Sequence, residues 1–264
     1  MRNEGASRDP YLLGSLRKGL EVLDCFARRE SWSLAELCAA LVQNKTTVFR
    51  MLHTLEEFGY LTKDSVTGRY ALGLRLLSLG GAAVRQETLR WQALAPLQDL
   101  ARRTGETVQV GVMHGTESVC VQAVEGTHLV RMHAFVGKRA PAHASALGKA
   151  MLAWRGEAEI RALFEGRALQ AFTPNTLTDA AALLAALQAT RLRGHSLDEE
   201  EMEIGLRCIG APIFDSAGRA SAALAVSVPA TRMDAARIAE LVPMVRDTAG
   251  QISRILGGPA VRAA

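Results

Sequence analysis

Six residues between positions 45 and 53 share one side of an expected helix, away from its apolar stripe, and their side chains suit binding. They are Lys45, Thr46, Thr47, Phe49, Arg50 and His53. Hydroxyl groups and long cations donate hydrogen bonds to phosphate oxygens and to base edges in the major groove. The unpaired N–H groups and positive dipole of a helix N-terminus also attract phosphate. This face therefore predicts contact with double-stranded DNA.

A second segment, Ala144-Ser145-Ala146-Leu147-Gly148-Lys149, superficially resembles a phosphate-cradling loop. The full pattern is missing, because Ala150 follows the lysine and no earlier glycine has the right spacing. We interpret the segment as a helix start whose N–H groups face an anion. The alternative is a simple helix cap in which Gly148 packs closely against its neighbours.

Cys208, His143 and Asp198 together have the residue types of a nucleophilic site. Nothing in the sequence brings the three into hydrogen-bonding order, so we expect no catalytic residue and no enzyme. The four cysteines form no CxxC pair, and no cysteine–histidine spacing matches a zinc site. We therefore expect neither a metal nor a cofactor.

Two short helices with a tight turn between them must position the DNA-facing residues. Ser33-Leu34-Ala35-Glu36 reads as a capping box for the first helix, and Asn44 can cap the second. The apolar stripe of the second helix comprises Val48, Met51, Leu52, Leu55 and Phe58. A preceding helix places Leu16, Leu20, Leu23 and Phe26 on one face.

After Gly59, two strand-like runs flank a turn that contains Asp64 and Gly68. This pattern predicts a β-hairpin wing, with Lys63 and Arg69 near its strands as candidates for phosphate contact. The first region is therefore a winged helix-turn-helix. We expect 1–11 to be disordered, 12–73 to form the DNA-binding domain, and 74–90 to form a linker helix, bent at Gly80-Gly81.

The remaining residues, 91–264, alternate groups of strands with groups of helices, which is typical of an α+β domain with an antiparallel sheet flanked by helices. We expect strands at 107–113, 118–124, 129–134, 207–214 and 220–228. We expect helices ending near 103 and at 146–154, 157–164, 179–193 and 234–256.

Charge and hydropathy agree with this organisation. Of the net charge of +4, residues 1–90 carry +3, with 13 Lys and Arg against 10 Asp and Glu. A modest basic excess suits nucleic-acid binding in this part. No apolar run approaches the roughly 20 residues that span a bilayer, and the first ten residues lack the apolar core of a signal peptide. We expect a cytoplasmic protein with no membrane partner.

Four segments in the right order make the chain similar to the IclR family of bacterial transcription regulators. They are Ser15 to Leu23, Asn44 to Leu61, Pro141 to Ala150, and Gly205 to Asp215. The resemblance runs from about Leu12 to the C-terminus. It implies a homodimer or a dimer of dimers, DNA recognition by the helix at 45–58, and a GAF-like effector-binding domain.

The resemblance also implies an effector pocket for a small organic acid. Its expected residues are Leu129, Met132, Ala140, Ser145, Ala146, Asp198, Cys208, Ala225 and Ser227. The best-known members carry a serine at the position of Ala225, so this chain resembles them less there. One hydroxyl for an effector carboxylate is missing, which favours a larger or less polar acid over a glyoxylate- or pyruvate-like one.

Three functions stay open at this point. The first is a regulator, such as a repressor of a catabolic operon, whose operator binding responds to the acid. The carboxylate of this acid would lie on the 145–146 turn and Ser227. The carbon body of the acid would pack against an apolar wall of Leu129, Met132 and Cys208. The second is a small-molecule hydrolase, and the third is a winged-helix scaffold that binds only protein.

Overall fold

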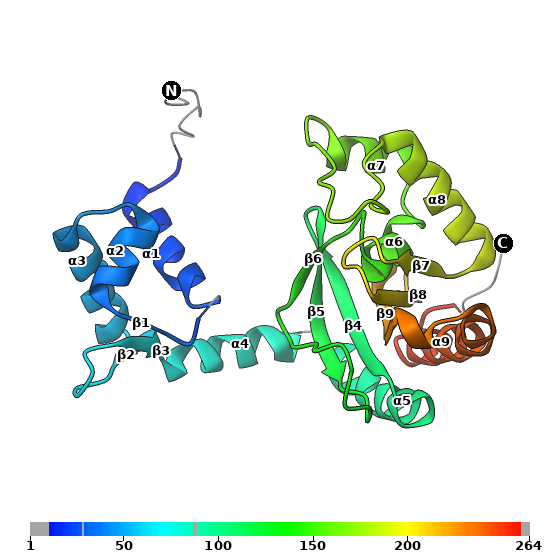
Figure 1. Cartoon of the computed structure of the whole chain (residues 1–264), viewed down its shortest axis with the longest axis horizontal. Helices are drawn as coiled ribbons and strands as arrows, with labels where there is room; N and C mark the ends of the chain where they lie inside the picture. Colours follow the sequence, from blue (N-terminus) through cyan, green and yellow to red (C-terminus); the bar gives the residue numbers. More distant parts are fainter. Residues whose placement is uncertain (1–10, 28, 87–88, 260–264) are drawn as a thin grey trace. The chain divides into compact units, whose positions relative to one another are not determined.

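The computed structural model describes residues 11–27, 29–86 and 89–259 (Figure 1). Contacts within the chain divide it into two compact units, Met1–Gln86 and Glu87–Ala264. The expected disordered N-terminus, 1–11, lies outside the described residues except for Tyr11. Within those residues, no helix combines the length and the apolar character that crossing a membrane requires.

The first unit contains the helix-turn-helix, formed by α1 (Gly14–Cys25), α2 (Leu34–Leu41) and α3 (Lys45–Glu57). The capping box is confirmed, because the Ser33 hydroxyl accepts from the Glu36 N–H and the Glu36 carboxylate accepts from the Ser33 N–H. The Asn44 side chain accepts from the Thr47 N–H at 2.8 Å. Val42 closes the turn in the left-handed conformation, with φ of 51°.

The core of this unit is built by Val22, Phe26, Leu37, Val48, Leu52, Leu61 and Tyr70. Two sequence predictions about it are wrong. Of the four residues predicted to share one face of the first helix, Phe26 lies in this core and Leu23 packs against it, whereas Leu16 and Leu20 are 59% and 54% exposed. Phe58 is 68% exposed, because α3 ends at Glu57 and the side chain no longer follows the buried stripe.

The wing is confirmed as an antiparallel pair, β2 (Leu61–Lys63) and β3 (Tyr70–Leu72), and β1 (Ser31–Trp32) adds a third strand that the sequence analysis did not predict. The strand order is β1-β3-β2. Asp64 orders the turn by accepting from the N–H groups of Val66 and Thr67. The following α4 (Leu74–Gln86) is helical through Gly80-Gly81.

The second unit is built on a six-stranded antiparallel sheet, with the order β6-β5-β4-β9-β8-β7. The strands are β4 (Thr107–His114), β5 (Glu117–Val124), β6 (Arg139–Pro141), β7 (Ser196–Glu199), β8 (Leu206–Phe214) and β9 (Ala220–Pro229).

The strand predicted at 129–134 is wrong, since that segment is irregular and 139–141 pairs with β5 instead. Side chains hold the segment, for example Thr107, whose hydroxyl donates to the Met132 carbonyl at 2.8 Å.

Helices cover both faces of this sheet (Figure 1). The long helices α5 (Leu89–Thr104) and α9 (Ala235–Ile255) pack on one face, and α6 (Ala146–Leu152) packs on the other. The remaining elements are α7 (Glu157–Phe164), α8 (Ala180–Arg193) and the short 3-10 helix η1 (Ala230–Arg232). Because side chains alternate along a strand, Ile209 and Leu224 join the core under α5 and α9, whereas Cys208, Ala223 and Ala225 face α6.

Candidate functional site

The side of α3 that faces away from the core carries the residues predicted to contact DNA. Lys45, Thr46, Phe49, Arg50 and His53 are exposed on it, and Thr47 is half-buried. The rings of Phe49 and His53 are stacked, with centroids 6.2 Å apart and planes 4° apart. This arrangement presents cations, hydroxyls and two flat rings on one solvent-facing surface.

The two wing cations differ in their surroundings. The Lys63 ammonium lies 5.4 Å from the centroid of the Tyr70 ring and its side chain is exposed. The Arg69 guanidinium is engaged inside the unit, where it donates to the hydroxyl and the carbonyl of Ser31 and to the carboxylate of Glu36, each at 2.9 Å. Arg69 therefore holds β1, β3 and α2 together, and its contact with phosphate stays a prediction.

Glu36 links this ion pair to the helix cap. Hydrogen bonds with the backbone and the hydroxyl of Ser33, together with the smaller effect of the charges of Arg29 and Arg69, lower its pKa to about 2. The carboxylate is therefore ionised at every pH at which the chain is expected to work.

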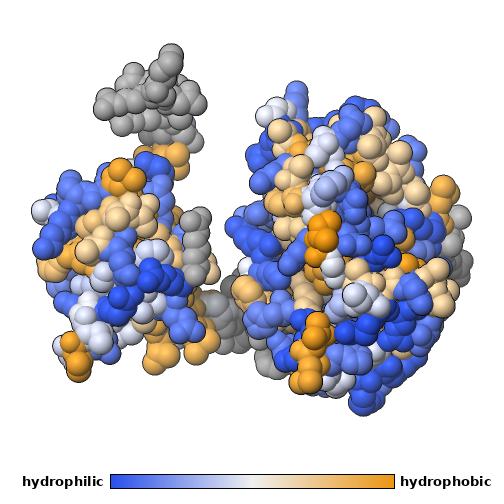
Figure 2. All heavy atoms as spheres, viewed as in Figure 1, coloured by the Kyte–Doolittle hydropathy of each residue, from blue (hydrophilic) through white to orange (hydrophobic). Residues whose placement is uncertain are grey.

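An apolar groove of about 690 Å³ lies between α1 and α3. Leu16, Leu20, Met51, Leu55 and Tyr60 are among the residues that line it. Figure 2 shows hydrophilic and apolar colours mixed on the visible face of each unit. Thr47 and Arg50, two of the residues predicted to contact DNA, also line this groove.

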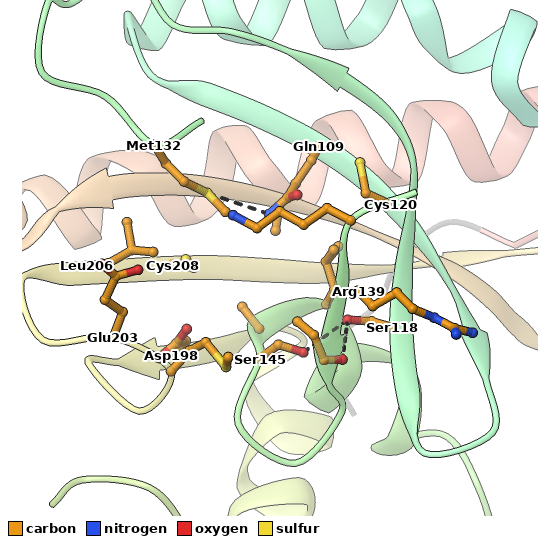
Figure 3. A pocket seen from close by; sticks show the side chains of 16 residues that line it. Gln109, Ser118, Cys120, Met132, Arg139, Ser145, Asp198, Glu203, Leu206 and Cys208 are labelled. Atoms are coloured by element: carbon orange, nitrogen blue, oxygen red, sulfur yellow. Dashed lines mark hydrogen bonds between the residues drawn. The ribbon is translucent and has the colours of Figure 1, made fainter. Parts of the chain in front are cut away.

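In the second unit, a pocket of about 110 Å³ lies between the sheet, α6 and the loop that carries Met132 (Figure 3). Seven of the nine residues predicted to bind an effector line it: Met132, Ala140, Ser145, Ala146, Asp198, Cys208 and Ala225. The structure does not place the other two in the lining. Leu129 is 98% exposed on the loop, and Ser227 is fully buried, where it accepts hydrogen bonds from Gln109 and Cys208.

Ser145 is the N-cap of α6, and its hydroxyl oxygen accepts from the Gly148 N–H at 3.2 Å. The same oxygen lies 3.2 Å from the hydroxyl oxygen of Ser118. A Cβ atom on Gly148 would lie 2.2 Å from the Ala142 Cα atom, which explains the glycine. The cap and the close packing are both present, and binding of an anion here stays a prediction.

Asp198 is a buried carboxylate in the pocket lining, on β7 opposite Cys208 on β8. One of its oxygens accepts from the Glu201 N–H at 2.8 Å. Burial raises its pKa to about 6, although that hydrogen bond and the charge of Lys149 act in the other direction. Lys149 is also buried and forms an ion pair with Glu201.

The structure does not assemble the nucleophilic site considered from sequence. Burial strongly raises the pKa of the Cys208 thiol, which donates to Ser227. The imidazole of His143 lies 3.0 Å from the carbonyl oxygen of Gln170, and its ring contacts Phe164 and Phe172. In the described part of the chain, no group of three His, Cys, Asp or Glu side chains could hold a metal ion.

Nine pocket residues were missed by sequence reasoning: Gln109, Ser118, Cys120, Lys138, Arg139, Leu147, Met202, Glu203 and Leu206. Period-two alternation could have found Gln109, a polar residue between Val108 and Val110, whose side chains point into the opposite core. Lys138 and Arg139 follow an irregular loop, and no local pattern marks them.

Models of two protein families match the chain. The IclR helix-turn-helix domain matches residues 15–65, and the bacterial transcriptional regulator IclR C-terminal domain matches residues 81–254. Among curated relatives, the regulator XynR of Escherichia coli is 35% identical over 250 residues, covering 94% of this chain and 99% of its own. The regulator KdgR of the same organism is 32% identical over 257 residues, covering 97% and 98%.

Solved structures agree with these matches. The Thermotoga maritima IclR superimposes with a TM-score of 0.76 at 32% identity, covering 92% of this chain and 98% of that one. An IclR homologue from Microbacterium hydrocarbonoxydans, complexed with 4-hydroxybenzoate, gives a TM-score of 0.79 at 25% identity with the same two coverages.

Proposed function

The chain belongs to the IclR family of bacterial helix-turn-helix transcriptional regulators, and we propose on this premise that a small organic acid, bound in the second unit, controls its binding to an operator. Its relatives are regulators and not enzymes. The observation that carries the proposal is the pocket of the second unit, whose lining combines apolar walls with carboxylates, hydroxyls and cations.

The proposed operator contact is made by α3 in the major groove. Arg50 is the candidate for reading a guanine edge, because it is exposed on the face opposite Val48 and Leu52. Lys63 on the wing is the candidate for a phosphate contact.

We propose that the chain binds as a homodimer or a dimer of dimers. The half-sites of the operator are then expected about 34–36 Å apart, or at multiples of this distance. The exposed apolar side chains of Leu16 and Leu20 on α1 support a dimer, since they leave an apolar face for a second copy to cover.

The proposed effector is a compact acid. An engineered protein cavity of about 150 Å³ holds benzene, and this pocket measures about 110 Å³. The volume supports a smaller ligand than the one expected from the missing hydroxyl at Ala225. The complex of the Microbacterium homologue with 4-hydroxybenzoate supports a carboxylic acid as the ligand class, and the cations Lys138 and Arg139 line the pocket here.

Two measurements on the full-length chain test this function. A gel shift with the DNA upstream of its own gene, or of a neighbouring catabolic operon, should show specific binding. A thermal-shift screen of small organic acids should then find a ligand, because an acid at 100 times its Kd stabilises the folded chain by about 2.7 kcal/mol. The proposal fails if no acid in the screen both stabilises the chain and changes its affinity for the operator.

A further inference from the structure

Phe49 places an apolar ring on a polar surface. Its side chain is 48% exposed on α3, and Lys45, Thr46, Arg50 and His53 are exposed on the same side of the helix. In the described part of the first unit, neither the core nor the groove between α1 and α3 includes this ring. An aromatic ring in water gains free energy when an apolar group covers it. Phe49 therefore offers a contact that the unit itself does not use.

His53 holds the Phe49 ring in place from the next turn of α3. The two rings are stacked, with their centroids 6.2 Å apart and their planes only 4° apart. Offset stacking at such a distance is a favourable arrangement of two aromatic rings. The stacking orders the ring before any partner binds, so binding costs little further side-chain entropy. An exposed apolar ring that is already ordered suits a contact surface.

Phe49 lies near the N-terminal end of α3, which begins at Lys45. Residues four apart are neighbours on a helix surface, so Lys45, Phe49 and His53 follow one row. In a helix-turn-helix, the N-terminal residues of the second helix contact base edges in the major groove. The cations Lys45 and Arg50 beside the ring suit contacts with phosphates and bases. The DNA contact proposed for this surface therefore brings the ring against base edges.

The major groove offers an apolar group that matches this ring, the C5-methyl group of thymine. The other groups that distinguish the bases there are hydrogen-bond donors and acceptors, which a phenylalanine ring cannot pair. We propose that Phe49 reads a thymine methyl group in each half-site of the operator, and that His53 positions its ring. This inference rests on the proposed function and makes Phe49 a residue that determines the operator sequence.

Deoxyuridine in place of thymine tests the proposal, because it removes the methyl group and keeps every donor and acceptor of the base pair. In the operator found by gel shift, each symmetry-related pair of thymines is replaced in turn. Fluorescence anisotropy then gives the methyl preference, the Kd for the replaced operator divided by the Kd for the unmodified one. Burying one methyl group favours binding about fourfold. With two recognition helices in a homodimer, one pair should give the full-length chain a methyl preference of roughly 15-fold.

Phe49→Ala should reduce the methyl preference at that pair to less than about twofold, because it leaves no ring to cover the methyl group. Two control variants should keep the full preference. Phe58→Ala removes an exposed ring about 2.5 turns further along the chain, which places it on the opposite side of the helix. Thr46→Ser removes a methyl group that could itself contact thymine, and it keeps the hydroxyl group of Thr46.

Each preference compares two operators with one protein preparation, so an unfolded fraction of a variant lowers both affinities equally and leaves the ratio unchanged. The proposal is overturned if the wild type shows no methyl preference at any pair of thymines, or if Phe49→Ala keeps the preference of the wild type. A preference that is lost in Thr46→Ser and kept in Phe49→Ala assigns the contact to Thr46. These results leave the proposed function intact if the unmodified operator is bound specifically and an acid changes its affinity. If no operator is bound specifically, both proposals fail.

Discussion

Replacing Asp198 by asparagine should stabilise the ligand-free second unit near neutral pH, because it removes a negative charge that the fold keeps buried. Burial raises the pKa of Asp198 from 3.8 to about 6. A tenfold change in an acid dissociation constant corresponds to about 1.4 kcal/mol. Ionised Asp198 therefore costs the folded unit up to about 3 kcal/mol at pH 8.

The direction of the pKa shift determines how the stability gained by Asp198→Asn changes with pH. The pKa is higher in the folded chain than in the unfolded chain, so the folded state binds the proton more tightly. The stability that comes from protonated Asp198 is fully present below pH 3.8 and is lost as the pH rises through about 6. The advantage of Asp198→Asn should thus be close to zero near pH 4 and approach about 3 kcal/mol at pH 8.

Urea unfolding at pH 4, 6 and 8 measures this difference, with hydrogen exchange in β7 and β8 reporting on the second unit separately from the first. Glu199→Gln, an exposed carboxylate on the same strand, should show no pH-dependent gain. A variant that is less stable than the wild type at pH 8, or equally stabilised at pH 4 and pH 8, would refute the reasoning.

Three further predictions concern the two units. Arg50→Ala should reduce the preference for the operator by about 1–3 kcal/mol while circular dichroism stays unchanged. Undiminished specific binding in fluorescence anisotropy would contradict this. Lys63→Ala should reduce the slope of log operator affinity against log salt concentration by about one. Arg69→Ala should instead lower the unfolding free energy of the first unit by about 1–3 kcal/mol, because Ser31 and Glu36 lose the hydrogen-bond donor that Arg69 provides. Gly148→Ser should lower the unfolding free energy of the second unit by about 3 kcal/mol, since the new Cβ atom would overlap Ala142. Gly156→Ser is the control, because its Cβ atom would lie in open space. Similar losses of stability in the two variants would contradict the close packing at Gly148.

Local signals in the sequence predicted the elements of the first unit well. The capping box of Ser33 and Glu36 and the Asn44 cap depend on residues three apart, so a short stretch of chain contains the whole signal. The burial of Leu16 and Leu20 could not be judged in this way, because α1 has two apolar faces and tertiary packing decides which one is covered.

For the pocket too, local sequence patterns predict only part of the lining, because segments far apart in the sequence complete it. Strand alternation places Cys208 and Ala225 on the face toward α6, as expected. Ser227 follows the same alternation, but Gln109 from another strand lies over it and takes its place in the lining. The apolar pattern at 129–134 resembles a strand, but residues 139–141 pair with residues 117–119, so a later segment occupies the edge of β5.

The most direct test of the central claim is the affinity of the full-length chain for its operator, measured with and without the acid that the screen identifies, in the wild type and in Ser145→Phe. Ser145 lines the pocket, so a phenylalanine there should fill it. We predict that the acid changes the operator Kd of the wild type by about 5- to 150-fold. Ser145→Phe should bind the operator in the absence of the acid, and adding the acid should no longer change its operator Kd. An equal response in folded Ser145→Phe would place the controlling site elsewhere and contradict the account.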